Sequence, residues 1–293
     1  MDIDLFSHLK EKMPKMSKGH KAIAAFILEH YDKAAFMTAQ KLGATVGVSE
    51  STVVRFASDL GLDGYPDLQR SLQELMRNRL TAIQRIEVTN ERLGQGDILD
   101  RVINLDIDKL RRTLEQTSRE AFEGAVKSIT EAQTIYILGT RSAASLASFL
   151  NYYLNLIYPQ VRLVRSTTTS EMFEQILRIG KDDVMIGISF PRYSKQTIKA
   201  LKYANESGAH VIAITDSDKS PIAQYADDLL CARSDMASFV DSLVAPLSLI
   251  NALIVGVGVR NQEQVSKSFE RLEKIWADYD VYEKGEDEPD ETV

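Results

Sequence analysis

The chain has 293 residues, of which 44% are hydrophobic and 26% are charged, which is typical of a globular protein with a hydrophobic core. The length suits one large domain or two ordinary ones. The single cysteine, Cys231, excludes an internal disulfide and favours a reducing compartment, so we expect a cytoplasmic protein.

The net charge of −7 argues against a nucleic-acid partner only until its distribution is considered. Residues 281–293 hold one lysine and six acids, and we predict a disordered acidic tail there. Residues 1–80 hold 11 basic and 10 acidic side chains and are nearly neutral. The longest apolar stretch, residues 243–259, is too short and too interrupted for a membrane span, and we expect a buried helix or one at a subunit interface.

Residues 1–80 show helical periodicity and no convincing strand. Thr38 can cap one short helix and Ser49 the next, and Gly47 lies between them where a tight turn needs a residue that tolerates positive φ. In the second helix, one face carries the core-facing stripe Val53, Phe56, Ala57 and Leu60. This spacing is typical of a helix-turn-helix, although two short helices packed at a turn would show it as well.

A helix-turn-helix places the start of its second helix in the major groove of DNA. Small hydroxyls let that helix lie deep, and Arg55 can reach a guanine or a phosphate. The predicted DNA-binding residues are Thr38, Lys41, Ser49, Ser51, Thr52 and Arg55. We predict that the domain over residues 1–80 is followed by a linker over 81–100.

From residue 134 onwards, short β-rich runs alternate with helical segments, which predicts a parallel sheet with helices on both faces. Five such strands suit a flavodoxin-like, doubly wound α/β domain with strand order 2-1-3-4-5. The predicted strands are 134–139, 161–166, 183–189, 210–215 and 228–232.

Two strand-to-helix loops, residues 139–145 and 189–197, hold more hydrogen-bond donors than a turn uses. In this strand order both loops flank the crevice where such sheets bind ligands, and helix N-termini favour an anion there. The predicted ligand-binding residues are Gly139, Arg141, Ser142, Ser189, Arg192, Tyr193, Ser194 and Thr197. The alternative is that Ser194 is only a helix cap, Arg192 a solvated surface group and Thr197 a helix hydroxyl.

The segments "ILGTRSAA", "SFPRYSKQT" and "ITDSDKSPIAQYAD" resemble the sugar-isomerase (SIS) domain. A helix-turn-helix followed by such a domain, here residues 101–280, resembles the RpiR family of bacterial regulators over nearly the whole chain. The resemblance implies an operator-binding homodimer or homotetramer whose SIS domain binds a phosphorylated sugar or sugar acid. The resemblance does not identify the effector or the operator. We take repression, and not activation, as the default mode of regulation.

Residue by residue, the resemblance places Ser189 and Ser194 at the first and last hydroxyls of the SIS pattern S-x-S-G-x-T. It places Gly139 at the glycine of the first loop, and Arg141 and Ser142 where that loop meets phosphosugar.

Three residues depart from the family pattern. Pro191 stands where the pattern has its middle serine, Arg192 where it has glycine, and Ile137 where the first loop has its first glycine. Either the Arg192 guanidinium substitutes for the lost donors or the site takes a different ligand.

SIS domains also occur in isomerases, which is the rival interpretation; a scaffold that only oligomerises is a third. An aldose–ketose isomerase needs a base, and Glu171 and Asp216 are the acidic candidates. Glu171 is more simply an acid in a first helical turn and Asp216 a turn-capping group, while His210 begins a strand at the wrong edge. We find no metal-ligand cluster and no P-loop and expect no cofactor, no membrane contact and no enzymatic activity.

Overall fold

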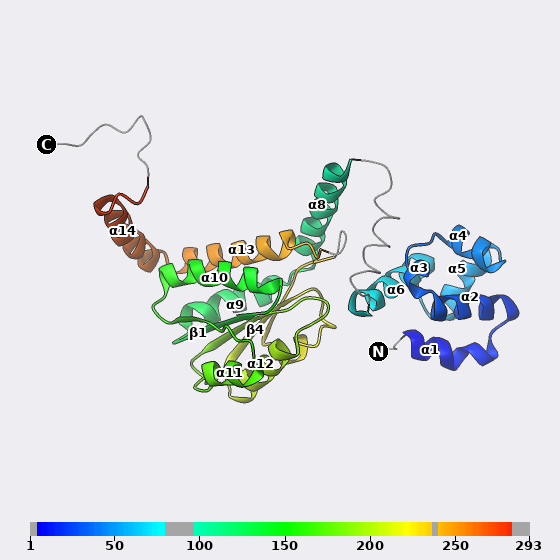
Figure 1. Cartoon of the computed structure of the whole chain (residues 1–293), viewed down its shortest axis with the longest axis horizontal. Helices are drawn as coiled ribbons and strands as arrows, with labels where there is room; N and C mark the ends of the chain where they lie inside the picture. Colours follow the sequence, from blue (N-terminus) through cyan, green and yellow to red (C-terminus); the bar gives the residue numbers. More distant parts are fainter. Residues whose placement is uncertain (1–4, 80–96, 236–239, 283–293) are drawn as a thin grey trace. The chain divides into compact units, whose positions relative to one another are not determined.

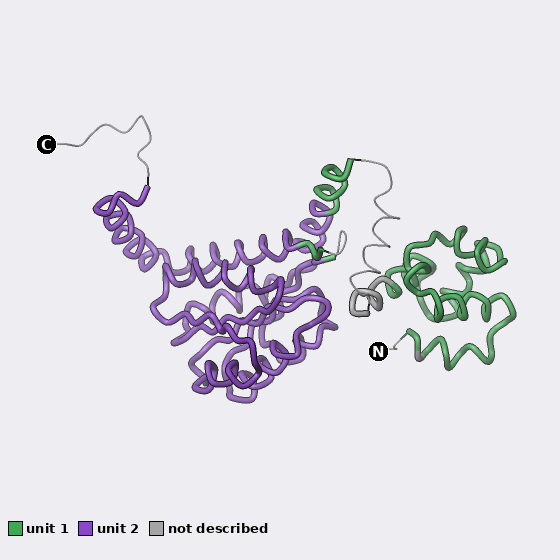
Figure 2. The backbone as a smooth tube through the Cα atoms, viewed as in Figure 1, with its two compact units in different colours: residues 1–105, 235–242 green, residues 106–234, 243–293 purple. Residues whose placement is uncertain are grey.

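The structure, a computed structural model, describes residues 5–79, 97–235 and 240–282. Figure 2 shows two compact units, residues 1–105 with 235–242 and residues 106–234 with 243–293. Most of the predicted linker, and all but the first two residues of the predicted acidic tail, lie outside the described residues.

The first unit is helical where it is described up to Arg79, as expected. Its core is a single cluster that includes Ile23, Ile27, Leu42 and Phe56. Its elements are α1 (Leu5–Lys12), the 3₁₀ helix η1 (Met13–Lys15), α2 (Lys18–Glu29), α3 (Tyr31–Ala34), α4 (Ala39–Val46), α5 (Glu50–Asp59) and α6 (Tyr65–Arg79).

The second unit contains the predicted sheet, with all pairs parallel and the order β2-β1-β3-β4-β5. Its strands are β1 (Ile135–Gly139), β2 (Val161–Leu163), β3 (Val184–Ile188), β4 (His210–Thr215) and β5 (Asp228–Cys231). The second strand ends earlier than predicted because the backbone of Arg165 bonds the Gln175 side chain instead of a neighbouring strand.

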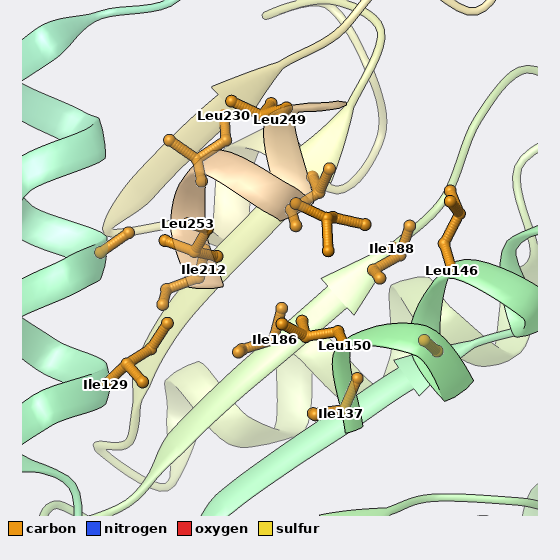
Figure 3. Close-up of a cluster of buried hydrophobic side chains, with 14 of the residues drawn as sticks. Ile129, Ile137, Leu146, Leu150, Ile186, Ile188, Ile212, Leu230, Leu249 and Leu253 are labelled. Atoms are coloured by element: carbon orange, nitrogen blue, oxygen red, sulfur yellow. The ribbon is translucent and has the colours of Figure 1, made fainter. Parts of the chain in front are cut away.

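Helices cover both faces of this sheet, as predicted (Figure 1). The helices from residue 98 onwards are α8 (Ile98–Gln116), α9 (Arg119–Glu131), α10 (Ala143–Ile157), α11 (Thr169–Ile176), α12 (Lys195–Glu206), η2 (Ala223–Tyr225), α13 (Val244–Arg260) and α14 (Gln262–Asp278), of which α8 and α14 project away from the sheet. On one face Ile137, Ile186 and Ile212 pack against α9, α10 and α13, as Figure 3 shows. On the other face Tyr136 and Met185 pack against α11 and α12.

The apolar stretch over residues 243–259 forms most of α13. One side of the helix, with Leu253 and Val257, is buried in the core, whereas Val255 and Val259 are 63% and 73% exposed. Among the described residues no single helix is long and apolar enough to cross a membrane. Only α13 and α14 taken together reach that length, and they are bent by 99° to one another.

Candidate functional site

The turn between α4 and α5 has the geometry that the sequence predicts. Thr38 and Ser49 cap the two helices through their side-chain oxygens, and Gly47 is left-handed with φ +76°. Gly43 has a role that the sequence did not reveal, because a Cβ there would lie 2.8 Å from the Val48 carbonyl oxygen. The close approach of α4 to the turn therefore requires glycine at this position.

The α5 helix has one buried and one open face. Val53, Phe56 and Ala57 have no exposed surface, whereas Glu50, Ser51, Val54, Arg55 and Ser58 are exposed. The Ser49 hydroxyl lies 2.9 Å from that of Ser51 and 2.8 Å from that of Thr52. Arg55 Nε donates to the Ser51 carbonyl at 3.3 Å. Four of the predicted DNA-binding residues, Ser49, Ser51, Thr52 and Arg55, thus lie at the N-cap or in the first part of α5, whereas Thr38 and Lys41 lie at the start of α4.

The second predicted site lies where β1 and β3 end side by side, with Gly139 paired to Ile188. Arg141 and Arg192, one in each following loop, are both exposed and both have positive φ, +58° and +68°. A left-handed conformation costs an L residue about 1–2 kcal/mol, which glycine would not incur. Such strain persists where the surrounding structure enforces it, and it concentrates at ligand clamps and active sites.

Ser189 and Ser194, in the loop after β3, both accept hydrogen bonds from backbone N–H groups. Ser194 caps α12 by accepting from the Thr197 N–H at 3.4 Å, as the alternative interpretation expected, and its role in ligand binding stays a prediction. Ser189, 4% exposed, accepts from the Ser194 N–H at 3.3 Å. In both bonds the serine oxygen accepts, so neither bond uses the hydroxyl proton.

Two further predicted residues differ in how accessible they are. Ser142 precedes α10 and is exposed, and it makes no capping bond to the helix. Thr197 is completely buried, and its Oγ1 has no hydrogen-bond partner in the described part of the chain. The Ser142 side chain is therefore open to solvent, whereas that of Thr197 is not.

A link between two loops was not expected. The Tyr193 hydroxyl donates to Asp216 Oδ1 at 2.7 Å, joining the loop after β3 to the end of β4. Thr215 donates to the same carboxylate, which is 4% exposed. Asp216 thus holds the loop after β3, while the turn-capping role that we predicted for it stays a prediction. The contact could have been predicted from the strand order, because Asp216 directly follows β4, which is the neighbour of β3 in the sheet.

The other titratable candidates have structural roles. Glu171 accepts from the Thr167 N–H at 3.1 Å, and Thr168 caps the same helix in return, which confirms the simpler reading of Glu171. His210 begins β4, at the opposite edge, and its Nε2 lies 2.7 Å from Asp228. Within the described ranges no three His, Cys, Asp or Glu side chains are grouped as metal ligands are.

Known proteins match both units. Residues 3–79 match the helix-turn-helix domain of the rpiR family, and residues 128–256 match the SIS domain. An HTH-type transcriptional regulator of Caldanaerobacter subterraneus subsp. tengcongensis is 22% identical, over 93% of this chain and 96% of its own length.

Two solved structures are similar as well. The sugar-isomerase domain of an RpiR transcription factor from Sphaerobacter thermophilus is 30% identical, with a TM-score of 0.58, over 61% of this chain and 99% of its own. The NanR protein of Vibrio vulnificus, solved in complex with ManNAc-6P, is 22% identical, with a TM-score of 0.58, over 94% of this chain and 99% of its own.

Proposed function

The chain belongs to the RpiR family of helix-turn-helix transcriptional regulators, and from that membership we propose that a phosphorylated sugar or sugar acid controls its binding to operator DNA. We propose further that it represses an operon for the catabolism of that compound. The observation that carries the proposal is the pairing of two sites in one chain, an open recognition helix and two donor-rich loops at adjacent strand ends.

For DNA, the support lies in the two faces of α5. The buried stripe holds the helix in the core, and the opposite face presents Ser51, Thr52 and Arg55, with Val54 exposed among them. The hydroxyls can bond base edges or phosphate oxygens, and the Arg55 guanidinium can bond guanine or phosphate. Thr38 and Lys41, at the start of α4, would contact phosphates.

For the effector, the support lies in the loops after β1 and β3. Arg141 and Arg192 retain strained backbones that glycine would relieve, which favours a role for their guanidinium groups. A guanidinium can hold a phosphate through two parallel hydrogen bonds, and the Ser189 and Ser194 hydroxyls add donors. The phosphosugar bound by the related NanR protein makes this ligand class the first to test.

Control would pass through an oligomer. The α13 helix is largely apolar, and its exposed side carries valines as well as Ser248 and Asn251. Its exposed Val255 and Val259, together with Val244, therefore suit a contact with a second copy in a homodimer or homotetramer. Ligand that orders the two loops would change the geometry between copies, and with it the spacing of their recognition helices.

We favour a regulator over an isomerase because the candidate bases have other tasks. Glu171 caps a helix, Asp216 holds Tyr193, and His210 lies at the opposite edge of the sheet. The regulators similar to this chain also match it over nearly its whole length.

A thermal-shift screen tests the effector. Phosphorylated sugars and sugar acids are compared with their unphosphorylated parents on the full chain. A ligand at 100 times its Kd adds about 2.7 kcal/mol to the free energy of unfolding, so a true effector gives a clear shift. We expect a phosphorylated compound to stabilise the protein and to change its affinity for its operator, and its parent to do neither. Stabilisation by parents and phosphates alike would contradict the anion site.

A further inference from the structure

The near neutrality of residues 1–80 conceals an uneven distribution of charge. Residues 8–21 hold five lysines and one glutamate, a net charge of +4, while residues 1–80 as a whole carry +1. The rest of that segment is therefore net −3. The five lysines, Lys10, Lys12, Lys15, Lys18 and Lys21, extend from the end of α1 through η1 into α2.

This basic segment packs directly beside the recognition helix. A Cβ on Gly19 would lie 3.3 Å from Val48 Cγ1 and 3.5 Å from Thr52 Cγ2, so the start of α2 touches the start of α5. Lys12 Nζ donates to the Asp59 carbonyl at 3.0 Å, and this bond ties the end of α1 to the end of α5. The segment is thus held along the length of α5 by contacts at both ends.

Between the two helices lies a groove of about 540 Å³. Its lining residues are Ser17, Gly19, His20, Val48, Ser49, Thr52, Arg55 and Asp59. One wall is the start of α2, and the other is the side of α5 that carries Thr52 and Arg55. The one acid in the lining, Asp59, lies at the far end of α5, where its carboxylate is 3.2 Å from His20 Nδ1.

Three of the lysines are available to a partner. Lys15, Lys18 and Lys21, which we call the lysine strip, are exposed, and in the described part of the chain none has a hydrogen-bond or ion-pair partner. Lys12, by contrast, is half-buried and engaged with α5. Three exposed ammonium groups in seven residues are a point-charge surface, which suits phosphates more than a shape-specific ligand.

We propose that the lysine strip binds the sugar-phosphate backbone of DNA beside the groove that α5 reads. The inference rests on the proposed DNA-binding function and adds to it a contact surface outside the helix-turn-helix. A duplex that meets Thr52 and Arg55 on one wall brings a phosphate strand towards the other wall. The strip would supply the positive charge that a nearly neutral domain otherwise lacks.

Such contacts position the protein without reading sequence, so they make binding depend on salt. Each lysine on a phosphate steepens the plot of log affinity against log salt by about 0.9. Loss of three such contacts per protomer flattens it by about 2.7. Over a fourfold rise in salt, the wild type then loses about 40-fold more affinity per bound protomer than the variant.

The experiment measures binding of the full chain to a mixed-sequence duplex of about three helical turns across a salt series. Wild type is compared with Lys15→Gln/Lys18→Gln/Lys21→Gln. A matched control, Lys33→Gln/Lys127→Gln/Lys181→Gln, removes the same charge from exposed lysines on α3, on α9 and before β3. Because all six side chains are exposed, unfolding temperatures should stay within a few degrees and serve as the check on folding.

We expect the strip variant to show the flatter salt dependence and the control variant to match the wild type. If the wild type binds and the strip variant keeps the full slope, the strip is not a phosphate contact, while DNA binding itself stands. If both variants lose the same amount of slope, net charge alone would explain the effect, and the proposed phosphate contacts of the lysine strip would be overturned as well. If the wild type shows no salt-dependent binding, the proposed DNA-binding function fails together with it.

Discussion

Replacing Arg192 with glycine should separate the strain of its backbone from the function of its side chain. The φ of +68° costs an L residue about 1–2 kcal/mol, which glycine does not incur. Glycine loses more chain entropy on folding, by roughly 0.5–1 kcal/mol. Arg192→Gly should therefore change the free energy of unfolding by between 0 and about 1.5 kcal/mol, in the stabilising direction.

Arg192→Ala is the matched comparison, because alanine also lacks the guanidinium but keeps the strain. It should be less stable than Arg192→Gly by about 1 kcal/mol, or about 2–4 °C in Tm for a unit of this size. At the proposed effector site, both variants would lose a charge-assisted hydrogen bond to the phosphate, worth about 1.5–3 kcal/mol. Both should therefore bind the effector about 10- to 150-fold more weakly.

Thermal unfolding and calorimetric titration with the effector from the screen measure the two properties separately. An Arg192→Gly protein that binds the effector with wild-type affinity would refute the role of the guanidinium. If the Tm of Arg192→Gly is equal to or lower than that of Arg192→Ala, the argument from backbone strain is refuted, whatever the binding result.

Arg55→Ala should weaken DNA binding by about 1–3 kcal/mol and leave effector stabilisation unchanged, as gel shift and thermal shift would measure; normal operator binding would contradict the assignment of α5. Gly43→Ala should lower the free energy of unfolding by about 1–3 kcal/mol, because the new methyl meets the Val48 carbonyl, and a melting temperature equal to wild type would contradict this. Burial, with smaller contributions from Asp218 and Asp216, raises the pKa of the Cys231 thiol to about 11 from its ordinary 9. Since the thiolate is the reactive form, alkylation of the native protein should rise with pH towards a midpoint near pH 11, and a midpoint near 9 in the folded chain would show that the thiol is not so buried.

Much of the candidate site followed from local pattern. Ser49 and Thr38 cap their helices through bonds to residues three positions on, and such bonds depend only on nearby sequence. Gly47 is left-handed for an equally local reason, since the turn needs a positive φ. The adjacency of the loops after β1 and β3 followed from the strand order, because parallel strands joined by helices have few topologies open to them.

Other roles depend on residues far apart in the chain. Thr197 looks like a surface hydroxyl in the first turn of a helix, yet packing buries it completely. Gly43 looks like an ordinary helical residue until the turn folds back upon it. Burial and close approach are set by which elements pack together, and no short window of sequence carries that information.

By itself, the sequence determined the alternation of strands and helices and the helix caps, since these rest on periodicity and on bonds between near neighbours. It predicted the strand order as well, because parallel strands joined by helices have few topologies open to them. It also placed the lysines at every third residue from 12 to 21. Only the tertiary structure laid that basic segment along α5, and only it joined Tyr193 to Asp216 across two loops. The reason is physical: such contacts form when the core brings distant segments together, and side-chain chemistry alone does not choose the partner.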